Sequence, residues 1–135
     1  MADWQEKGPR ILIVEDDQSI QTLMGLVLSR EDHWQPVSVP DGASAIQTWG
    51  TGNVDVILMD VKLPGMDGIE VTRRIRAAEK SSHRGHTPVI AFSAVATKEC
   101  RQQCLDAGVD DFLAKPTNMK TLVETIHKHL PTFPD

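Results

Sequence analysis

The sequence predicts an α/β fold in which one parallel sheet is covered by helices on both faces. Runs of apolar and β-branched residues alternate five times with segments whose apolar residues recur every three or four positions. The run Ile11–Val14 is continuously apolar, which is typical of a strand buried on both faces. The length of 135 residues fits one domain with its own core. We therefore expect five strand-then-helix units in a single domain.

The first two units occupy the N-terminal part of the chain. After strand 11–14, apolar residues repeat along one face of a helix over 20–28. The next strand, 34–39, is weaker. Pro36 places it at an edge of the sheet, because proline cannot donate a hydrogen bond to a second neighbouring strand. A short helix over 43–49 follows an Asp-Gly turn and completes the second unit.

The third unit contains the strand that we expect at the centre of the sheet. Residues 54–59 are rich in valine, isoleucine and leucine, and a helix with an apolar face over 69–75 follows them. A polar segment over 80–87 predicts a loop. Pro88 then opens the fourth strand, 89–92.

The last part of the chain predicts a helix, a strand and a final helix. The helix over 97–107 ends at Gly108, a residue that commonly terminates helices. A short strand over 111–114 comes next. Apolar residues then recur along the final helix, 119–130. We place the domain at residues 9–130. The flanking segments are a polar arm at 1–8 and a proline-containing tail at 131–135.

Composition excludes several classes of protein. The formal net charge of −5 argues against a surface that binds nucleic acid or an anionic membrane. No apolar run approaches the roughly 20 residues that cross a bilayer. The two cysteines, Cys100 and Cys104, form no disulfide framework, so we expect a cytoplasmic protein.

Polar side chains stand where four of the predicted strands end. Right-handed crossovers bring the C-terminal ends of parallel strands to one edge of the sheet, where ligands bind in such folds. The residues at these ends are Glu15, Asp16, Asp17, Asp60, Ser93 and Lys115. We therefore expect one small pocket that holds several carboxylates, a hydroxyl and an ammonium group.

Carboxylates gathered in one pocket need a compensating interaction. Two carboxylates about 4 Å apart repel by roughly 4 kcal/mol at an effective dielectric constant of about 20. Raised pKa values, the adjacent Lys115, or a divalent cation such as Mg²⁺ can each offset this repulsion. Carboxylate, cation, lysine and hydroxyl together suit phosphoryl transfer onto an aspartate.

The sequence resembles the receiver domains of response regulators, the CheY-like modules of two-component signalling, over residues 9–130. The similarity rests on four stretches in the family's order and spacing: 11–17, 56–68, 88–94 and 107–116. It implies a flavodoxin-like (βα)5 doubly wound parallel sheet with strand order 2-1-3-4-5. The 80–87 loop and the stretch 104–115 are also similar to receivers attached to hybrid sensor kinases.

The resemblance implies that Asp60 is the phosphoacceptor. The donor would be a phosphohistidine on a histidine kinase or a histidine phosphotransfer protein. Glu15 and Asp16 match the acidic pair that holds the cofactor Mg²⁺ together with Asp60, and Lys62 matches the position that supplies a backbone carbonyl ligand. Asp17 has no required role in the family and suits a helix cap.

The resemblance also assigns residues to the bound phosphoryl group and to its effects. The residues implied to contact the phosphoryl group are Ser93, Ala94 and Lys115, with a cis peptide bond between Lys115 and Pro116. Ser93 and Phe112 match the positions that switch conformation. The face formed by the last two helices and the last strand would then bind a downstream protein.

Two positions match those that tune the lifetime of the phosphoryl group, Lys62 and Val95. Val95 has no group that can orient an attacking water, so we expect slow self-dephosphorylation.

Two other functions stay open from the residues alone. A Mg²⁺-dependent phosphohydrolase would use the same aspartyl-phosphate chemistry, but Lys62 stands where some such enzymes have an acid. A receiver-like module that only binds partners would not need the intact set of polar residues. We therefore do not expect an enzyme, apart from self-phosphorylation and self-dephosphorylation.

Cysteines and histidines give weaker signals. Cys100 and Cys104 share a helix face, which favours buried thiols because no second ligand pair at zinc spacing accompanies them. We expect surface positions for the five histidines, His33, His83, His86, His127 and His129.

Overall fold

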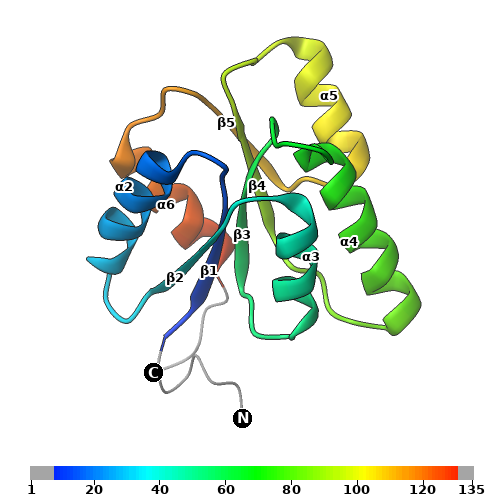
Figure 1. Cartoon of the computed structure of the whole chain (residues 1–135), viewed down its shortest axis with the longest axis horizontal. Helices are drawn as coiled ribbons and strands as arrows, with labels where there is room; N and C mark the ends of the chain where they lie inside the picture. Colours follow the sequence, from blue (N-terminus) through cyan, green and yellow to red (C-terminus); the bar gives the residue numbers. More distant parts are fainter. Residues whose placement is uncertain (1–7, 131–135) are drawn as a thin grey trace.

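The computed structural model describes residues 8–130 and contains one sheet of five parallel strands in the order β2-β1-β3-β4-β5 (Figure 1). The strands are β1 (Arg10–Val14), β2 (Gln35–Val39), β3 (Val56–Asp60), β4 (Val89–Ser93) and β5 (Asp111–Ala114). The helices are α2 (Gln18–Ser29), α3 (Gly42–Gly50), α4 (Gly68–Ser82), α5 (Lys98–Ala107) and α6 (Met119–His129). The predicted fold class and strand order are confirmed.

The ends of the chain lie outside the described residues. Of the arm expected at 1–8, only Gly8 is described, and none of the tail at 131–135 is. No helix within the described residues is long and apolar enough to cross a membrane.

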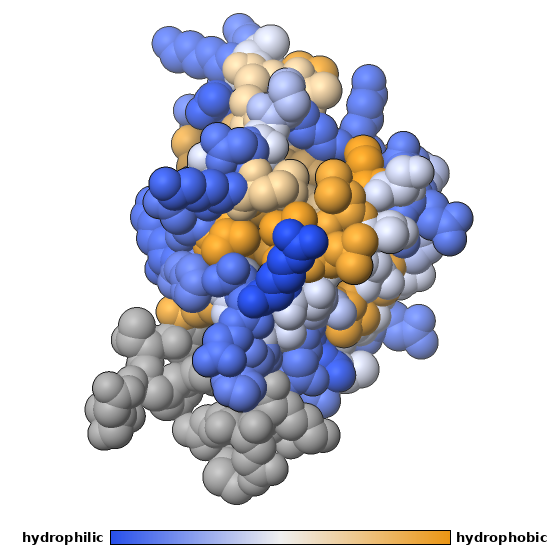
Figure 2. All heavy atoms as spheres, turned by 90° about the vertical axis from the view of Figure 1, so that its left-hand side faces the viewer, coloured by the Kyte–Doolittle hydropathy of each residue, from blue (hydrophilic) through white to orange (hydrophobic). Residues whose placement is uncertain are grey.

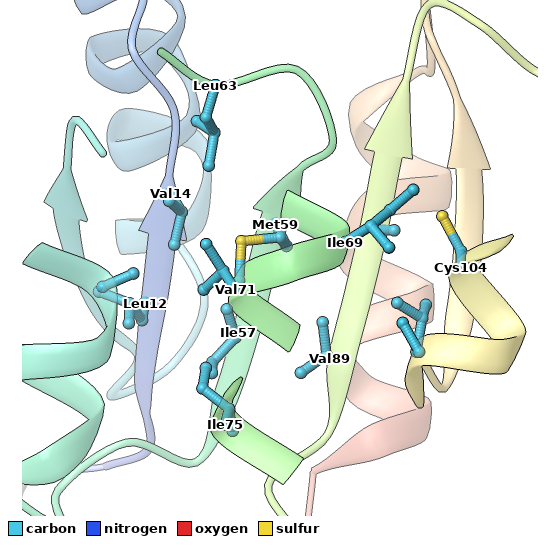
Figure 3. Packing of buried hydrophobic residues seen from close by; sticks show 14 of the residues in the cluster. Leu12, Val14, Ile57, Met59, Leu63, Ile69, Val71, Ile75, Val89 and Cys104 are labelled. Carbon is cyan, nitrogen blue, oxygen red and sulfur yellow. The ribbon is translucent and has the colours of Figure 1, made fainter. Parts of the chain in front are cut away.

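The sheet buries apolar side chains on both faces. Successive residues of a strand point to opposite faces. Leu12 and Val14 of β1 therefore join the cluster beneath α3, α4 and α5, whereas Ile11 and Ile13 join the cluster beneath α2 and α6. Figure 3 shows the first cluster, where Val71 of α4 lies against β3. The central strands β3 and β4 are buried along their whole length, so the residues at their ends are firmly placed.

The helices begin at residues whose side chains accept hydrogen bonds from the first turn. These capping residues are Asp17, Asp41, Asp67, Thr97 and Asn118. The expected cap role of Asp17 is confirmed, since its carboxylate accepts from the backbone N–H groups of Ser19 and Ile20. Gly108 ends α5 with a φ of 103°, as its position in the sequence predicts.

Helix α4 is longer than the sequence predicts. It continues to Ser82, so the expected loop at 80–87 begins only at His83, where φ is 58°. The hydroxyl groups of Ser81 and Ser82 donate hydrogen bonds to the carbonyl of Ala78. Polar residues on the exposed side of a helix do not end it while its opposite side is packed, and α4 is therefore longer than predicted.

One histidine departs from the expected surface position. His129 of α6 is half-buried, and its Nε2 lies 2.9 Å from a carboxylate oxygen of Asp111 at the start of β5. His127, two residues earlier and so on a different face of the helix, is exposed, and its ring centroid lies 4.7 Å from that of Trp34. His129 is half-buried because α6 packs against the sheet. A polar side chain gives no sign of this in the sequence.

A network of charged groups ties α4 to the edge of the sheet opposite the strand C-termini. The guanidinium of Arg76 lies 2.8 Å from Glu79 and 2.8 Å from Asp110, and it donates to the carbonyls of Gly108 and Thr87. Glu79 in turn accepts from the backbone N–H of Thr87 at 2.7 Å. Both Arg76 and Glu79 are largely buried, and Arg76 supplies the positive charge that compensates the Glu79 carboxylate.

We expect Arg76→Ala to lower the free energy of unfolding by about 3 kcal/mol, because it leaves the buried Glu79 carboxylate without its partner. Urea denaturation measures the change. The control is Arg73→Ala on the exposed side of the same helix, where the ion pair with Glu70 at 3.6 Å is open to solvent and contributes little. Equal effects of the two substitutions would contradict this interpretation.

Candidate functional site

The polar residues predicted to meet come together at the C-terminal edge of the sheet. Glu15 follows β1, Asp60 and Ser93 end β3 and β4, and Lys115 follows β5. Because these four strands are neighbours in a parallel sheet, their C-terminal ends lie side by side.

Asp60 lies at the centre of this edge and is only 4% exposed. One carboxylate oxygen accepts the backbone N–H of Lys62 at 3.1 Å, and the other lies 3.2 Å from the ammonium of Lys115. Lys115 is itself held by the ring of Phe92, whose centroid lies 4.7 Å from Nζ. A buried carboxylate with a cation on one oxygen and an amide on the other has a fixed orientation.

Glu15 and Asp16 complete a group of three carboxylates with Asp60. One oxygen from each lies within 4.8 Å of the others. Glu15 is 1% exposed, and its Oε2 has no hydrogen-bond partner, although Lys115 Nζ lies 3.8 Å away. Burial, together with hydrogen bonding to Asp60 and its negative charge, raises the pKa of Glu15 to about 8.

This group fits a hard divalent cation. Carboxylate oxygens are the ligands that Mg²⁺ prefers, and a buried carboxylate oxygen without a partner is costly unless something binds it. Within residues 8–130, metal-binding side chains gather in threes only here. The cysteines on α5 lie elsewhere. Cys104 is fully buried, which raises the pKa of its thiol to about 11, and Cys100 is half-buried.

The remaining predicted residues lie on β4 and β5 and in the loops that follow them. The Ser93 hydroxyl accepts the backbone N–H of Val95 at 3.0 Å, and the Ser93 carbonyl accepts from the backbone of Lys115 at 2.8 Å. Ala94 and Val95 are exposed beside the site. Phe112 is half-buried on β5. The peptide bond between Lys115 and Pro116 is cis, as expected.

No local sequence pattern singles out Gly68, but the structure brings it against Asp60. A Cβ at this position would stand 2.3 Å from the carbonyl oxygen of Asp60, and the Gly68 N–H donates to Val61. The start of α4 can therefore approach the end of β3 only with glycine here. A second overlooked residue is Gln21 of α2, whose amide donates to the carbonyl of Glu15.

An apolar hollow of about 420 Å³ borders the site on the side of α2. Its lining includes Ile20 and Met24 of α2, Met119 of α6, and Lys115. Figure 2 shows apolar side chains gathered on this face. Leu23, which also lines the hollow, is 51% exposed. The Lys115 side of the site thus borders an exposed apolar surface.

Comparison with known proteins agrees with this geometry. The family described as the response regulator receiver domain matches residues 11–127. The transcriptional regulatory protein TcrA of Mycobacterium tuberculosis is 38% identical over 115 residues, which are 85% of this chain and 43% of TcrA. The chain therefore spans less than half the length of this relative.

Two solved structures are similar over nearly the whole chain. The receiver domain of the sensor histidine kinase PA1611 from Pseudomonas aeruginosa, with magnesium coordinated in its active site cleft, is 36% identical. Its TM-score is 0.78, over 90% of this chain and 96% of that one. The receiver domain of Ssk1 from Saccharomyces cerevisiae, in complex with the histidine phosphotransfer protein Ypd1, has a TM-score of 0.84 and 27% identity. That match covers 90% of this chain and 88% of the Ssk1 chain.

The raised pKa of Glu15 predicts a pH-dependent stability in the metal-free protein. The folded state keeps the proton up to a pH of about 8, whereas the unfolded carboxyl loses it near its ordinary value of 4.5. Glu15 therefore contributes stability that is complete below that ordinary value and is lost as the pH rises toward 8. The slope is at most about 1.4 kcal/mol per pH unit.

Urea denaturation in the presence of a chelator, at several pH values in this window, measures the slope. Glu15→Gln should flatten it, and the matched acid-to-amide control Asp17→Asn in the same loop should not. A slope that survives in Glu15→Gln would show that another group is responsible.

Proposed function

The chain belongs to the response regulator receiver domain family, and on this basis we propose that Asp60 accepts a phosphoryl group from a phosphohistidine of a partner protein. One observation carries the proposal. The Asp60 carboxylate is buried and oriented between the Lys62 N–H and the Lys115 ammonium, beside two further carboxylates. Phosphoryl transfer consists mostly of positioning and charge neutralisation, and this arrangement supplies both.

In the proposed reaction a carboxylate oxygen of Asp60 attacks the phosphorus of the phosphohistidine. The new bond joins oxygen and phosphorus, while the phosphorus–nitrogen bond breaks and its electron pair stays on the imidazole. Lys115 compensates the negative charge that arrives with the phosphoryl group, from its place 3.2 Å from Asp60. The backbone N–H of Lys62 keeps the attacking carboxylate in one orientation.

The residues suited to hold Mg²⁺ are Glu15, Asp16 and Asp60, with the backbone carbonyl of Lys62 as a further ligand. The unpartnered Oε2 of Glu15 supports this assignment. When bound, the cation neutralises charge on the phosphoryl oxygens. The magnesium in the similar PA1611 receiver is consistent with this cofactor.

Phosphorylation would act on the rest of the domain through Ser93. Its hydroxyl accepts from Val95, so its proton is free to be donated to a phosphoryl oxygen. Such a bond draws Ser93, Ala94 and the following loop toward Asp60. We propose that this movement, with Phe112, changes the face formed by α5, β5 and α6, where a downstream protein binds.

The phosphodonor would approach over α2. This helix contains no charged residue. Its exposed Leu23 lines the apolar hollow on the face that borders the site, and Leu26, three residues further along, is also exposed. We infer that a histidine kinase or a histidine phosphotransfer protein contacts this face by apolar packing. The complex of the similar Ssk1 receiver with Ypd1 supports a partner of this class. The free cysteines suit the reducing cytoplasm, where we place the protein.

Acetyl phosphate with Mg²⁺ should add one phosphoryl group to the protein, and Asp60→Asn should abolish the addition. Intact-protein mass spectrometry measures both. Asp17→Asn, which changes a capping carboxylate in the neighbouring loop, should be phosphorylated like the wild type.

Other outcomes would favour the other functions. No addition to the wild type would indicate a module that only binds partners. Repeated turnover of a small phosphate ester would indicate a phosphohydrolase.

The side chain of Val95 predicts a long-lived aspartyl phosphate, because valine cannot orient a water for attack on phosphorus. We expect Val95→Glu to hydrolyse the phosphoryl group at least about tenfold faster, since a carboxylate there can act as a general base. The decay of the phosphorylated mass after removal of acetyl phosphate gives the rate. Val95→Leu is the control and should match the wild type. Equal rates for the glutamate and wild-type proteins would exclude this role.

A further inference from the structure

The N-terminal half of α5 is weakly attached to the rest of the domain. None of the residues 98–103 is fully buried, and the buried residues of α5, Cys104 and Ala107, both lie in its second half. The preceding loop, 94–97, is exposed throughout and is joined directly to Ser93. A segment with so few buried contacts has a low local stability. A displacement of Ser93 can therefore move the loop 94–97 and the N-terminal half of α5 at little cost.

Arg101 provides a contact between this half of α5 and the sheet. Its guanidinium carbon lies 4.8 Å from the centroid of the Phe112 ring on β5. Arg101 is exposed and Phe112 is half-buried, so the guanidinium covers the solvent side of the ring. A contact of this kind is weak at an exposed site, so a small change in the protein can release it.

Open space beside two sides of α5 allows its N-terminal half to move. A hollow of about 220 Å³ is lined by Arg101, Leu105, Val109 and Phe112, among others. A second hollow, of about 340 Å³, lies between α4 and α5 and is lined in part by Ser93 and residues of the α5 N-terminal half. The segment can therefore shift without compressing a packed core, provided that the Arg101–Phe112 contact is released.

We propose that Arg101 is a positioning residue that holds the N-terminal half of α5 on β5 in the unphosphorylated protein and so opposes the switch. This inference rests on the proposed phosphoacceptor function. A contact present in only one of two states biases the equilibrium toward that state. Removing the contact must therefore tighten the binding of a ligand that favours the other state, by up to the factor with which the contact biases the equilibrium.

The test uses beryllofluoride with Mg²⁺ as a phosphoryl mimic at Asp60, and NMR titration measures its apparent affinity. We expect Arg101→Ala to bind the mimic about two- to fivefold more tightly than the wild type, and Arg101→Lys to lie between them. The affinity for Mg²⁺ alone should be unchanged. The matched control is Lys98→Ala, which removes an exposed cation from the same helix.

The direction of the change in affinity for beryllofluoride distinguishes release of the contact from the loss of a positive charge. Loss of a positive charge near an anion site weakens anion binding. Tighter binding by Arg101→Ala therefore supports release of the contact. Unchanged or weaker binding by Arg101→Ala, or equal tightening in Lys98→Ala, would overturn the proposal while leaving the acceptor function intact. Failure of the wild type to bind the mimic would overturn both the role of Arg101 and the acceptor function of Asp60.

Discussion

The repulsion among three carboxylates at one edge of the sheet is the constraint on which the site depends. Glu15, Asp16 and Asp60 each have an oxygen within 4.8 Å of the others. Lys115 offsets part of this repulsion, and the raised pKa of Glu15 offsets another part by keeping it protonated. Both together still leave the Oε2 atom of Glu15 without a hydrogen-bond partner. A site of this kind favours a divalent cation and responds to any group that changes its charge.

The fold places the site on firmly packed strands and leaves a less buried segment, the loop after Ser93 and the first half of α5, beside it. The central strands are buried throughout, Gly68 brings α4 against the carbonyl of Asp60, and the Arg76 network anchors α4 at the opposite edge. In contrast, the loop after Ser93 and the first half of α5 are exposed. The proposed chemistry at Asp60 would thus occur on a fixed framework, and its effects would pass into the part of the domain with the fewest buried contacts.

Much of this arrangement could be predicted from local patterns. Continuous apolar runs identified the strands, Pro36 identified the edge, and the polar residues directly after the strands identified the site. The errors occurred where local pattern and packing disagree. Polar residues at the end of α4 suggested a loop, although the packed side of the helix continues to Ser82. His129 was expected at the surface, although Asp111 of a neighbouring strand holds it half-buried.

The sequence by itself determined which side chains end the strands, because the alternation of strand and helix depends on residues close together in the chain. It thereby determined that Asp60, Ser93 and Lys115 share one edge. Only the tertiary structure decided the unpartnered state of Glu15, the close approach of Gly68 and the contact of Arg101 with Phe112. Each of these depends on a distance between elements that pack together after folding. Such distances follow from packing on the sheet, which no local pattern specifies.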